Sequence, residues 1–358
     1  MAGTDAGFFD LYAVAGMTET RLKRLLERFR TPEAVFAAAD AELLQVERVD
    51  AEFVRALRGY RRSPELATAI ERARQDGVTT VSYLDDEFPE NLKAVPHMPP
   101  VLFIRGRVEP RDRLAVAVVG TRRATHYGAQ VAERLAAELV QAGVTVVSGL
   151  ARGIDTHAHK GALAGGGRTI AVLGCGIDQC YPPENRKLFE QIVRQGAVMT
   201  EFTLGVGPLA MNFPKRNRIV SALVRVVVAV EAGEKSGVLN TVAWAVEQGR
   251  TVFAVPGRIT DVQSVGTNRL LREGASPVTA VGDILAELGV SERPVLRPPI
   301  EVGAELKPVL DYIGADPLHI DEICEGLGLP MARLLSLLLE LELKGAVRQL
   351  PGKFFVRS

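Results

Sequence analysis

Short runs of apolar, mostly β-branched residues alternate with helical stretches between about residues 101 and 290, and this alternation constrains the fold more than any other feature. The runs are residues 114–119, 144–147, 169–173, 197–200, 224–230 and 251–255. Stretches with helical spacing, such as 127–141 and 239–248, lie between them. Strands that are apolar along their whole length are buried on both faces. The pattern therefore predicts an α/β domain whose doubly wound parallel sheet is covered by helices on each side.

The rest of the sequence predicts smaller units around this domain. Residues 1–80 carry apolar side chains at helical spacing, which predicts a small helical domain. Residues 81–290 hold the α/β pattern, and residues 291–303 contain the prolines of an extended linker. Residues 304–358 predict three helices and then a hairpin around Pro351-Gly352, which is the layout of a winged helix.

The C-terminal unit has a composition that argues against reading of duplex DNA. Residues 304–358 contain 6 Lys and Arg against 8 Asp and Glu, and the predicted last helix carries six leucines between Leu334 and Leu341 with only Arg333 as a cation. A helix that reads a DNA groove needs polar and basic side chains. We therefore expect this unit to dock on a protein surface. The alternative is that its own small core uses all of these leucines.

Glycine-containing turns follow four of the predicted strands. These turns are residues 120–123, 148–155, 174–178 and 231–237. In an open parallel sheet, ligands bind beyond the carboxyl ends of the strands, so the turns are expected to converge. Glycine lets the backbone approach a ligand closely, and the amides at helix starts favour an anion. Tight turns need glycine in any such fold, but the basic residues beside them favour a phosphate site.

A local concentration of positive charge lies just before the fifth apolar run. Lys215, Arg216 and Arg218 fall within four positions, and residues 202–230 contain no acidic residue. The whole chain has 43 basic and 43 acidic residues, so this is a local patch and not a general charge. Such a patch attracts phosphates, above all a run of them. The alternative is a surface loop with structural Arg–carboxylate pairs.

The common nucleotide-binding motifs are missing. Gly120 is not followed by a G-x-G-x-x-G pattern, and Glu234 occupies the position of the last glycine of a P-loop before Lys235-Ser236. The phosphates expected at this site are therefore not those of NAD or ATP.

Catalytic patterns are weak as well. Asp155 and Glu231 could form a general acid/base pair, but we favour a structural role in which Asp155 orients its turn with Arg152 and Glu231 ends its strand. His157 and His159 lie on different faces of a helix and have no further ligands for a metal. Cys175 has no obvious base beside it.

These segments together resemble the DprA (Smf) family of bacterial DNA-processing proteins. The matching segments are Val119–Arg122, Ser148–Asp155, Gly174–Gly176 with Tyr181-Pro182, Phe213–Arg218, Lys235–Gly237 and Gly266–Asn268. The resemblance implies an extended Rossmann-like domain, flanked by an N-terminal SAM-like helical domain and a C-terminal winged helix.

The resemblance also implies a function in natural transformation. A member of the family would bind and protect single-stranded DNA in the cytoplasm, form a homodimer through the Rossmann-like domain and load the RecA recombinase, with single-stranded-DNA-binding protein as a further partner. It implies no enzymatic activity, cofactor, metal or membrane. Carried over by motif, the DNA contacts would be Gly120, Arg122, Arg123, Ser148, Gly149, Arg152, Phe213, Lys215, Arg216, Arg218, Lys235 and Ser236.

Two rival functions come from other classes. Related Rossmann-like proteins hydrolyse nucleoside monophosphates and carry a Pro-Gly-Gly-x-Gly-Thr signature, which residues 231–237 lack. A nucleotide-sensing regulator could bind duplex DNA through its winged helix, but the acidic C-terminal unit counts against that function.

Overall fold

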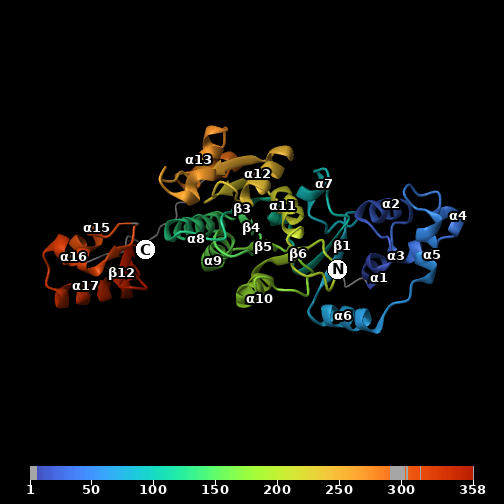
Figure 1. Cartoon of the computed structure of the whole chain (residues 1–358), viewed down its shortest axis with the longest axis horizontal. Helices are drawn as coiled ribbons and strands as arrows, with labels where there is room; N and C mark the ends of the chain where they lie inside the picture. The colour runs from blue at the N-terminus through green and yellow to red at the C-terminus, as the bar shows by residue number, and fades with distance from the viewer. Residues whose placement is uncertain (1–5, 291–302, 304, 315, 358) are drawn as a thin grey trace. The chain divides into compact units, whose positions relative to one another are not determined.

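The computed structural model describes residues 6–290, 303, 305–314 and 316–357 (Figure 1). The chain separates into two compact units, of which one contains the N-terminal helices and the large sheet and the other contains the C-terminal elements with residues 125–131. The expected linker at 291–303 falls almost wholly outside the described residues. None of the helices in the described part of the chain has the length and apolarity needed to cross a membrane.

Six short helices form the N-terminal part of the first unit. They are α1 (Ala6–Ala13), α2 (Glu19–Phe29), α3 (Pro32–Ala37), α4 (Asp40–Leu43), α5 (Ala51–Gly59) and α6 (Pro64–Gln75). Local side chains determine where they begin. Thr18 accepts a hydrogen bond from the Arg21 amide at the start of α2, and Ser63 accepts one from the Leu66 amide at the start of α6. Such caps satisfy amides that have no partner within the helix.

A nine-stranded sheet forms the body of the first unit. Its strands are β1 (Thr79–Ser82), β2 (Val101–Gly106), β3 (Ala115–Val119), β4 (Thr145–Ser148), β5 (Thr169–Val172), β6 (Ala197–Thr200), β7 (Val226–Ala229), β8 (Thr251–Ala254) and β9 (Ser276–Pro277). The strand order is β1-β2-β6-β5-β4-β3-β7-β8-β9. All six strands predicted from the apolar runs are confirmed, and they pair in parallel.

The sheet is mixed and not parallel throughout. β2 pairs antiparallel with β6, and β1 pairs antiparallel with β2. Neither strand was predicted from the sequence. Because β1 spans residue 80, the sheet takes in residues on both sides of the domain boundary expected there. Phe103 of β2 explains how the N-terminal helices attach, because its ring stacks on Phe9 of α1 at 4.6 Å between centroids. Both side chains are fully buried, so the helical part and the sheet share one core.

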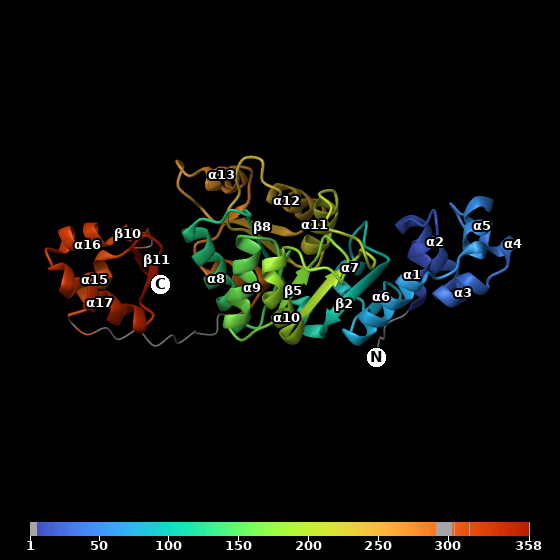
Figure 2. The same cartoon turned by 60° about the horizontal axis from the view of Figure 1, so that its bottom comes forward.

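Helices cover both faces of the sheet, as predicted. They are α7 (Glu90–Lys93), α8 (His126–Gln141), α9 (Ile154–Ala164), α10 (Arg186–Gln195), α11 (Asn212–Ala222), α12 (Val238–Glu247), α13 (Val265–Arg272) and α14 (Val281–Leu288). Figures 1 and 2 show α8, α9 and α10 on one face and α11, α12 and α13 on the other. The basic segment that could have been a loop lies on α11.

The C-terminal unit has the winged-helix layout that the sequence predicts. It contains α15 (Lys307–Tyr312), β10 (Leu318–His319), α16 (Ile320–Leu327), α17 (Met331–Leu343), β11 (Val347–Leu350) and β12 (Phe354–Arg357). The last three strands form a small sheet in the order β10-β12-β11.

The leucines of α17 divide between a core and an open surface. Leu334, Leu337, Leu338 and Leu341 are buried in the core of the unit. Leu335 and Leu339, by contrast, are 48% and 58% exposed. The small core therefore uses only part of the leucine-rich helix, and an apolar stripe is left on its surface.

Candidate functional site

The chain reverses its direction across the sheet between β3 and β7, and a pocket opens there. β3 leads to β4 on one side, whereas β7 pairs with β3 on the other side. The resulting cavity, which we call the strand-end pocket, has a volume of about 650 Å³ and is lined by the turns after β3, β4 and β7 and by one side of α11. Open α/β sheets bind ligands at such a reversal. Three of the four glycine turns therefore converge as predicted, whereas residues 174–178 do not line this pocket.

Two arginines give the strand-end pocket its charge. Arg122 and Arg123 follow β3, line the cavity and are exposed. Neither side chain forms an ion pair with a carboxylate of the described residues. Asp155 is the one acidic side chain among the described residues of the lining, and it is buried. The pocket therefore presents uncompensated positive charge to an incoming anion.

One aromatic ring is held beside these arginines. The ring of Phe213, on α11, has the Arg122 guanidinium 4.9 Å from its centroid and the Tyr181 ring 5.7 Å away. Gly174 packs against the same ring, since a Cβ at that position would come within 2.9 Å of it. Phe213 is half-buried. A base can therefore contact only part of one ring face or the ring edge, and cannot stack on the whole ring.

Arg216 forms the floor of the pocket and is buried. Its Nη1 donates hydrogen bonds to the carbonyl oxygens of Gly149 and Val172. Asp155 supplies the nearby negative charge, and its Oδ2 accepts hydrogen bonds from the amides of Gly149 and Ala151 at 3.2 and 3.4 Å. Burial lowers the pKa of Arg216 and raises the pKa of Asp155. Arg216 thus ties β4, β5 and α11 together beneath the pocket.

The glycines of the turns make room for protein side chains. A Cβ on Gly120 would lie 2.3 Å from Ile154, and a Cβ on Gly149 would lie 2.1 Å from the Arg216 guanidinium. Gly153 adopts φ +74°, a conformation that disfavours other residues. These positions need glycine because side chains of α9 and α11 pack directly against the turns. This agrees with the alternative that tight turns need glycine in any such fold.

Arg218 lies on the opposite side of α11 from Phe213 and is also engaged. It forms ion pairs with Glu201, which is buried, and with Glu19 of α2 at 3.4 Å. Its Nη1 donates to the His97 carbonyl oxygen at 2.6 Å. Burial raises the pKa of Glu201 above the usual range of a carboxyl group. The alternative of a structural Arg–carboxylate pair therefore describes this one residue of the basic segment.

Arg152 does not orient the turn with Asp155, contrary to expectation. Its guanidinium pairs with Glu184 on the surface. Asp155 instead accepts the amides of its own turn, and the cation that acts on it electrostatically is Arg216, which reaches the turn from α11. Arg152 lines a small hollow beside the strand-end pocket, together with Arg122 and Phe213.

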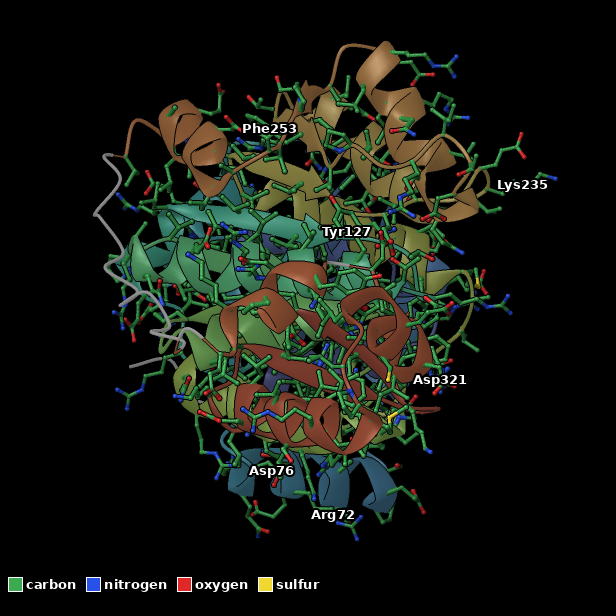
Figure 3. All side chains as sticks on the ribbon, turned by 90° about the vertical axis from the view of Figure 1, so that its left-hand side faces the viewer. Arg72, Asp76, Tyr127, Lys235, Phe253 and Asp321 are labelled. Carbon is green, nitrogen blue, oxygen red and sulfur yellow. The ribbon has the colours of Figure 1, made fainter. Side chains whose placement is uncertain are left out.

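The remaining expected contacts are distributed around these features. Gly120, Gly149 and Ser236 line the strand-end pocket. Ser148 is buried and donates to the Val118 carbonyl oxygen at 2.7 Å. Lys235 precedes the pocket-lining Ser236 and is exposed, and Figure 3 shows it extending outward from the edge of the unit. Lys215, also exposed, lines a second cavity on the other side of α11.

The catalytic candidates of the sequence have structural surroundings. Burial raises the pKa of Cys175 to about 12, so its thiolate is scarce at neutral pH. Burial lowers the pKa of His159 to about 3, and its Nδ1 lies 2.7 Å from the Thr169 hydroxyl. His157 lies 2.6 Å from Glu133. Among the described residues, no group of three or more His, Cys, Asp or Glu side chains could hold a metal ion.

Two asparagines of the pocket were missed in the sequence. Asn217 on α11 donates to Asn240 of α12 at 3.2 Å, and both line the cavity. Asn240 follows Lys235-Ser236-Gly237 within one helical turn of the start of α12, so the motif could have pointed to it. Asn217 lies inside the basic segment, between Arg216 and Arg218, and no local signal in the sequence distinguishes it as a pocket residue.

Comparison with known proteins places these motifs in one family. The sequence profile described as DNA recombination-mediator protein A matches residues 79–289, and that of the DprA winged helix domain matches residues 292–353. The chain is 32% identical to Protein Smf of Synechocystis over 397 aligned positions, with all of both chains covered.

Solved structures agree with this similarity. DNA processing protein A from Streptococcus pneumoniae has a TM-score of 0.64 and 34% identity, covering 80% of this chain and 99% of its own. DNA processing protein A from Helicobacter pylori, whose structure was described for its single-stranded DNA binding mode, has a TM-score of 0.54 and 32% identity. It covers 59% of this chain and 95% of its own.

Proposed function

The chain belongs to the DNA recombination-mediator protein A (DprA) family, and on that premise we propose that it binds single-stranded DNA at the strand-end pocket. The observation that carries the proposal is the pair of exposed arginines, Arg122 and Arg123, which line the pocket without a carboxylate partner among the described residues. Phosphates supply most of the affinity for nucleic acid, and cations without partners can neutralise them without breaking a bond within the protein.

The proposed contacts fall into two groups. Arg122, Arg123, Lys215 and Lys235 are exposed and neutralise phosphates. Phe213 offers its accessible edge to a base. The second group supports the first from within, because Arg216, Arg218 and Ser148 are buried with protein partners. Gly120 and Gly149 keep the backbone of the pocket close to α9 and α11, and Arg152 with Ser236 completes its rim.

The proposed role is to protect incoming single strands in the cytoplasm and to load RecA onto them during natural transformation. The description of the family as a recombination mediator supports the role. A homodimer through the Rossmann-like domain is part of the proposal. The exposed apolar side chains of Ile259, Val262 and Val265, which follow β8, support self-association there. Single-stranded-DNA-binding protein is a further partner in this scheme.

The rival hydrolase function finds little support at this site. Asp155 is buried, and its carboxylate already accepts two backbone amides. Glu231 is 1% exposed. A carboxylate that acts on a substrate must reach it within hydrogen-bond distance. We therefore propose a binding protein and not an enzyme, and release of free base from AMP by the purified chain would contradict this.

The test is a salt titration of oligo-dT binding by the full chain. Arg122→Ala and Lys215→Ala should each make the negative slope of log K against log salt shallower by roughly 0.7, because one phosphate contact is lost. The matched control is Lys160→Ala, since Lys160 is exposed on α9 and lines neither cavity. Slopes that stay at the wild-type value in both variants would show that the site is elsewhere.

A further inference from the structure

A second cavity lies on the other side of α11, where the N-terminal helices meet the sheet domain. This α2–α11 cleft has a volume of about 830 Å³, which exceeds that of the strand-end pocket. Its walls come from α1, α2, the loop before β2, the turn after β6, α11 and α12. We infer that the cleft binds further nucleotides of the same single-stranded DNA. The inference rests on the proposed function, whose contacts lie at the strand-end pocket apart from Lys215, which lines the cleft.

Continuity between the two cavities comes from α11. Residues three or four apart lie on one face of a helix. Phe213, Arg216 and Asn217 face the strand-end pocket, whereas Lys215 and Arg218 face the cleft. Pro214 and Lys215 are exposed at the start of the helix. A strand that leaves the pocket over this helix start therefore meets the cleft next.

The cleft contains cations that are free to neutralise phosphates. Lys23 of α2 and Lys215 of α11 line it from opposite walls, and neither forms an ion pair with a carboxylate of the described residues. The Lys23 ammonium lies 5.9 Å from the centroid of the Tyr83 ring, a contact that leaves its charge available to a phosphate. The other two cations are occupied: Arg24 pairs with Glu27 and Glu47, and Arg218 pairs with Glu201 and Glu19. Lys23 and Lys215 are thus the expected phosphate contacts, and the other two fix the walls.

The cleft also contains aromatic rings that can stack on bases. Trp244 of α12 lies with its ring centroid 6.4 Å from that of His97, in an edge-to-face arrangement. His97 is exposed, and Trp244 and Phe202 are partly exposed. Lysines next to accessible rings are the composition of a single-strand path, whereas a peptide groove would not need cations without partners. The predicted stacking surface is small, in keeping with the single Trp of the chain.

The single Trp also provides the test. Fluorescence excited selectively at tryptophan reports on Trp244 alone, because the chain has one Trp. It can be followed while oligo-dT of about 6 or about 20 nucleotides is added, lengths chosen to occupy one or both cavities. We expect the longer oligonucleotide to change the Trp244 emission and the shorter one to leave it unchanged. Lys23→Ala should lower the salt slope for the longer oligonucleotide by about 0.7 and leave the slope for the shorter one unchanged. Lys160→Ala should alter neither slope.

The outcomes separate this inference from the proposed function. If both lengths bind but Trp244 emission stays constant, and Lys23→Ala keeps the wild-type slope, the cleft is not part of the DNA path and only the inference is overturned. If the wild-type chain binds neither length, the proposed function and the inference both fall. The emission change in the wild-type chain remains decisive if Lys23→Ala folds poorly.

Discussion

Removal of the Arg216 side chain is expected to destabilise the first unit strongly. Arg216→Ala leaves the carbonyl oxygens of Gly149 and Val172 without their donor and leaves Asp155 buried without its neighbouring cation. Each buried acceptor that is left without a donor costs about 1–3 kcal/mol, so the two carbonyl oxygens together account for about 2–6 kcal/mol. At an m value of about 3 kcal/mol/M in urea, that lowers the unfolding midpoint by roughly 1 M or more.

The loss should depend on pH through Asp155. Burial already raises the pKa of Asp155 in the folded protein above its unfolded value, which is near 3.9. Removing the cation raises this pKa further. The folded state then binds a proton more readily than the unfolded state, so the relative stability of the variant increases as the pH falls. The deficit of Arg216→Ala should therefore be largest at neutral pH and should shrink toward pH 4.

Urea unfolding of the full chain between neutral pH and about pH 5 measures both effects. The double variant Arg216→Ala with Asp155→Asn should recover part of the loss at neutral pH, since the unpaired charge is gone. Arg122→Ala is the matched control, because Arg122 is exposed and should keep the wild-type midpoint. A wild-type midpoint for Arg216→Ala, or a deficit that grows as the pH falls, would refute the reasoning and return Arg216 to the group of direct DNA contacts.

Three further predictions concern other parts of the chain. Burial raises the pKa of Cys175 to about 12, so Cys175 should react with iodoacetamide at pH 8 at least about 100-fold more slowly in the folded than in the unfolded chain. Mass spectrometry of the modified site measures both rates, and equal rates in the two states would contradict the prediction. Leu338→Ala should destabilise the winged-helix unit by about 2–5 kcal/mol, because Leu338 is buried, whereas Leu339→Ala should cost less than about 0.5 kcal/mol. Hydrogen exchange in α17 measures both losses of stability, and equal losses would show that both side chains are in the core. A chain of residues 1–290 should keep binding oligo-dT, because both cavities lie within it; complete loss of binding at low salt would place the site in the C-terminal unit.

Much of the fold follows from the sequence because burial on both faces leaves a pattern that can be seen locally. β3 to β8 are mostly apolar, with a Thr or Ser only at the ends of some strands, and each was predicted to within about two residues. The three helices and the hairpin of the winged helix were predicted as well, because they are encoded by short-range signals, but the two-residue strand β10 was not. β1 and β2 were not predicted, since their place in the sheet depends on pairing with β6 and on the ring of Phe9 against Phe103.

For the candidate site, the sequence predicted the location but not the roles of the individual cations. The glycine turns and the basic segment pointed to the strand-end pocket as the candidate site, because strand ends of a parallel sheet must converge. The roles of the neighbouring cations Lys215, Arg216 and Arg218 could not be separated, because each helical residue turns by about 100° and only the packing of α11 decides which side chain is exposed. Tertiary structure buried Arg216 and Arg218 against partners from other strands and helices and left Lys215 open. A sequence records which charges a chain has, whereas the surroundings that neutralise them are assembled from distant segments only when the chain folds.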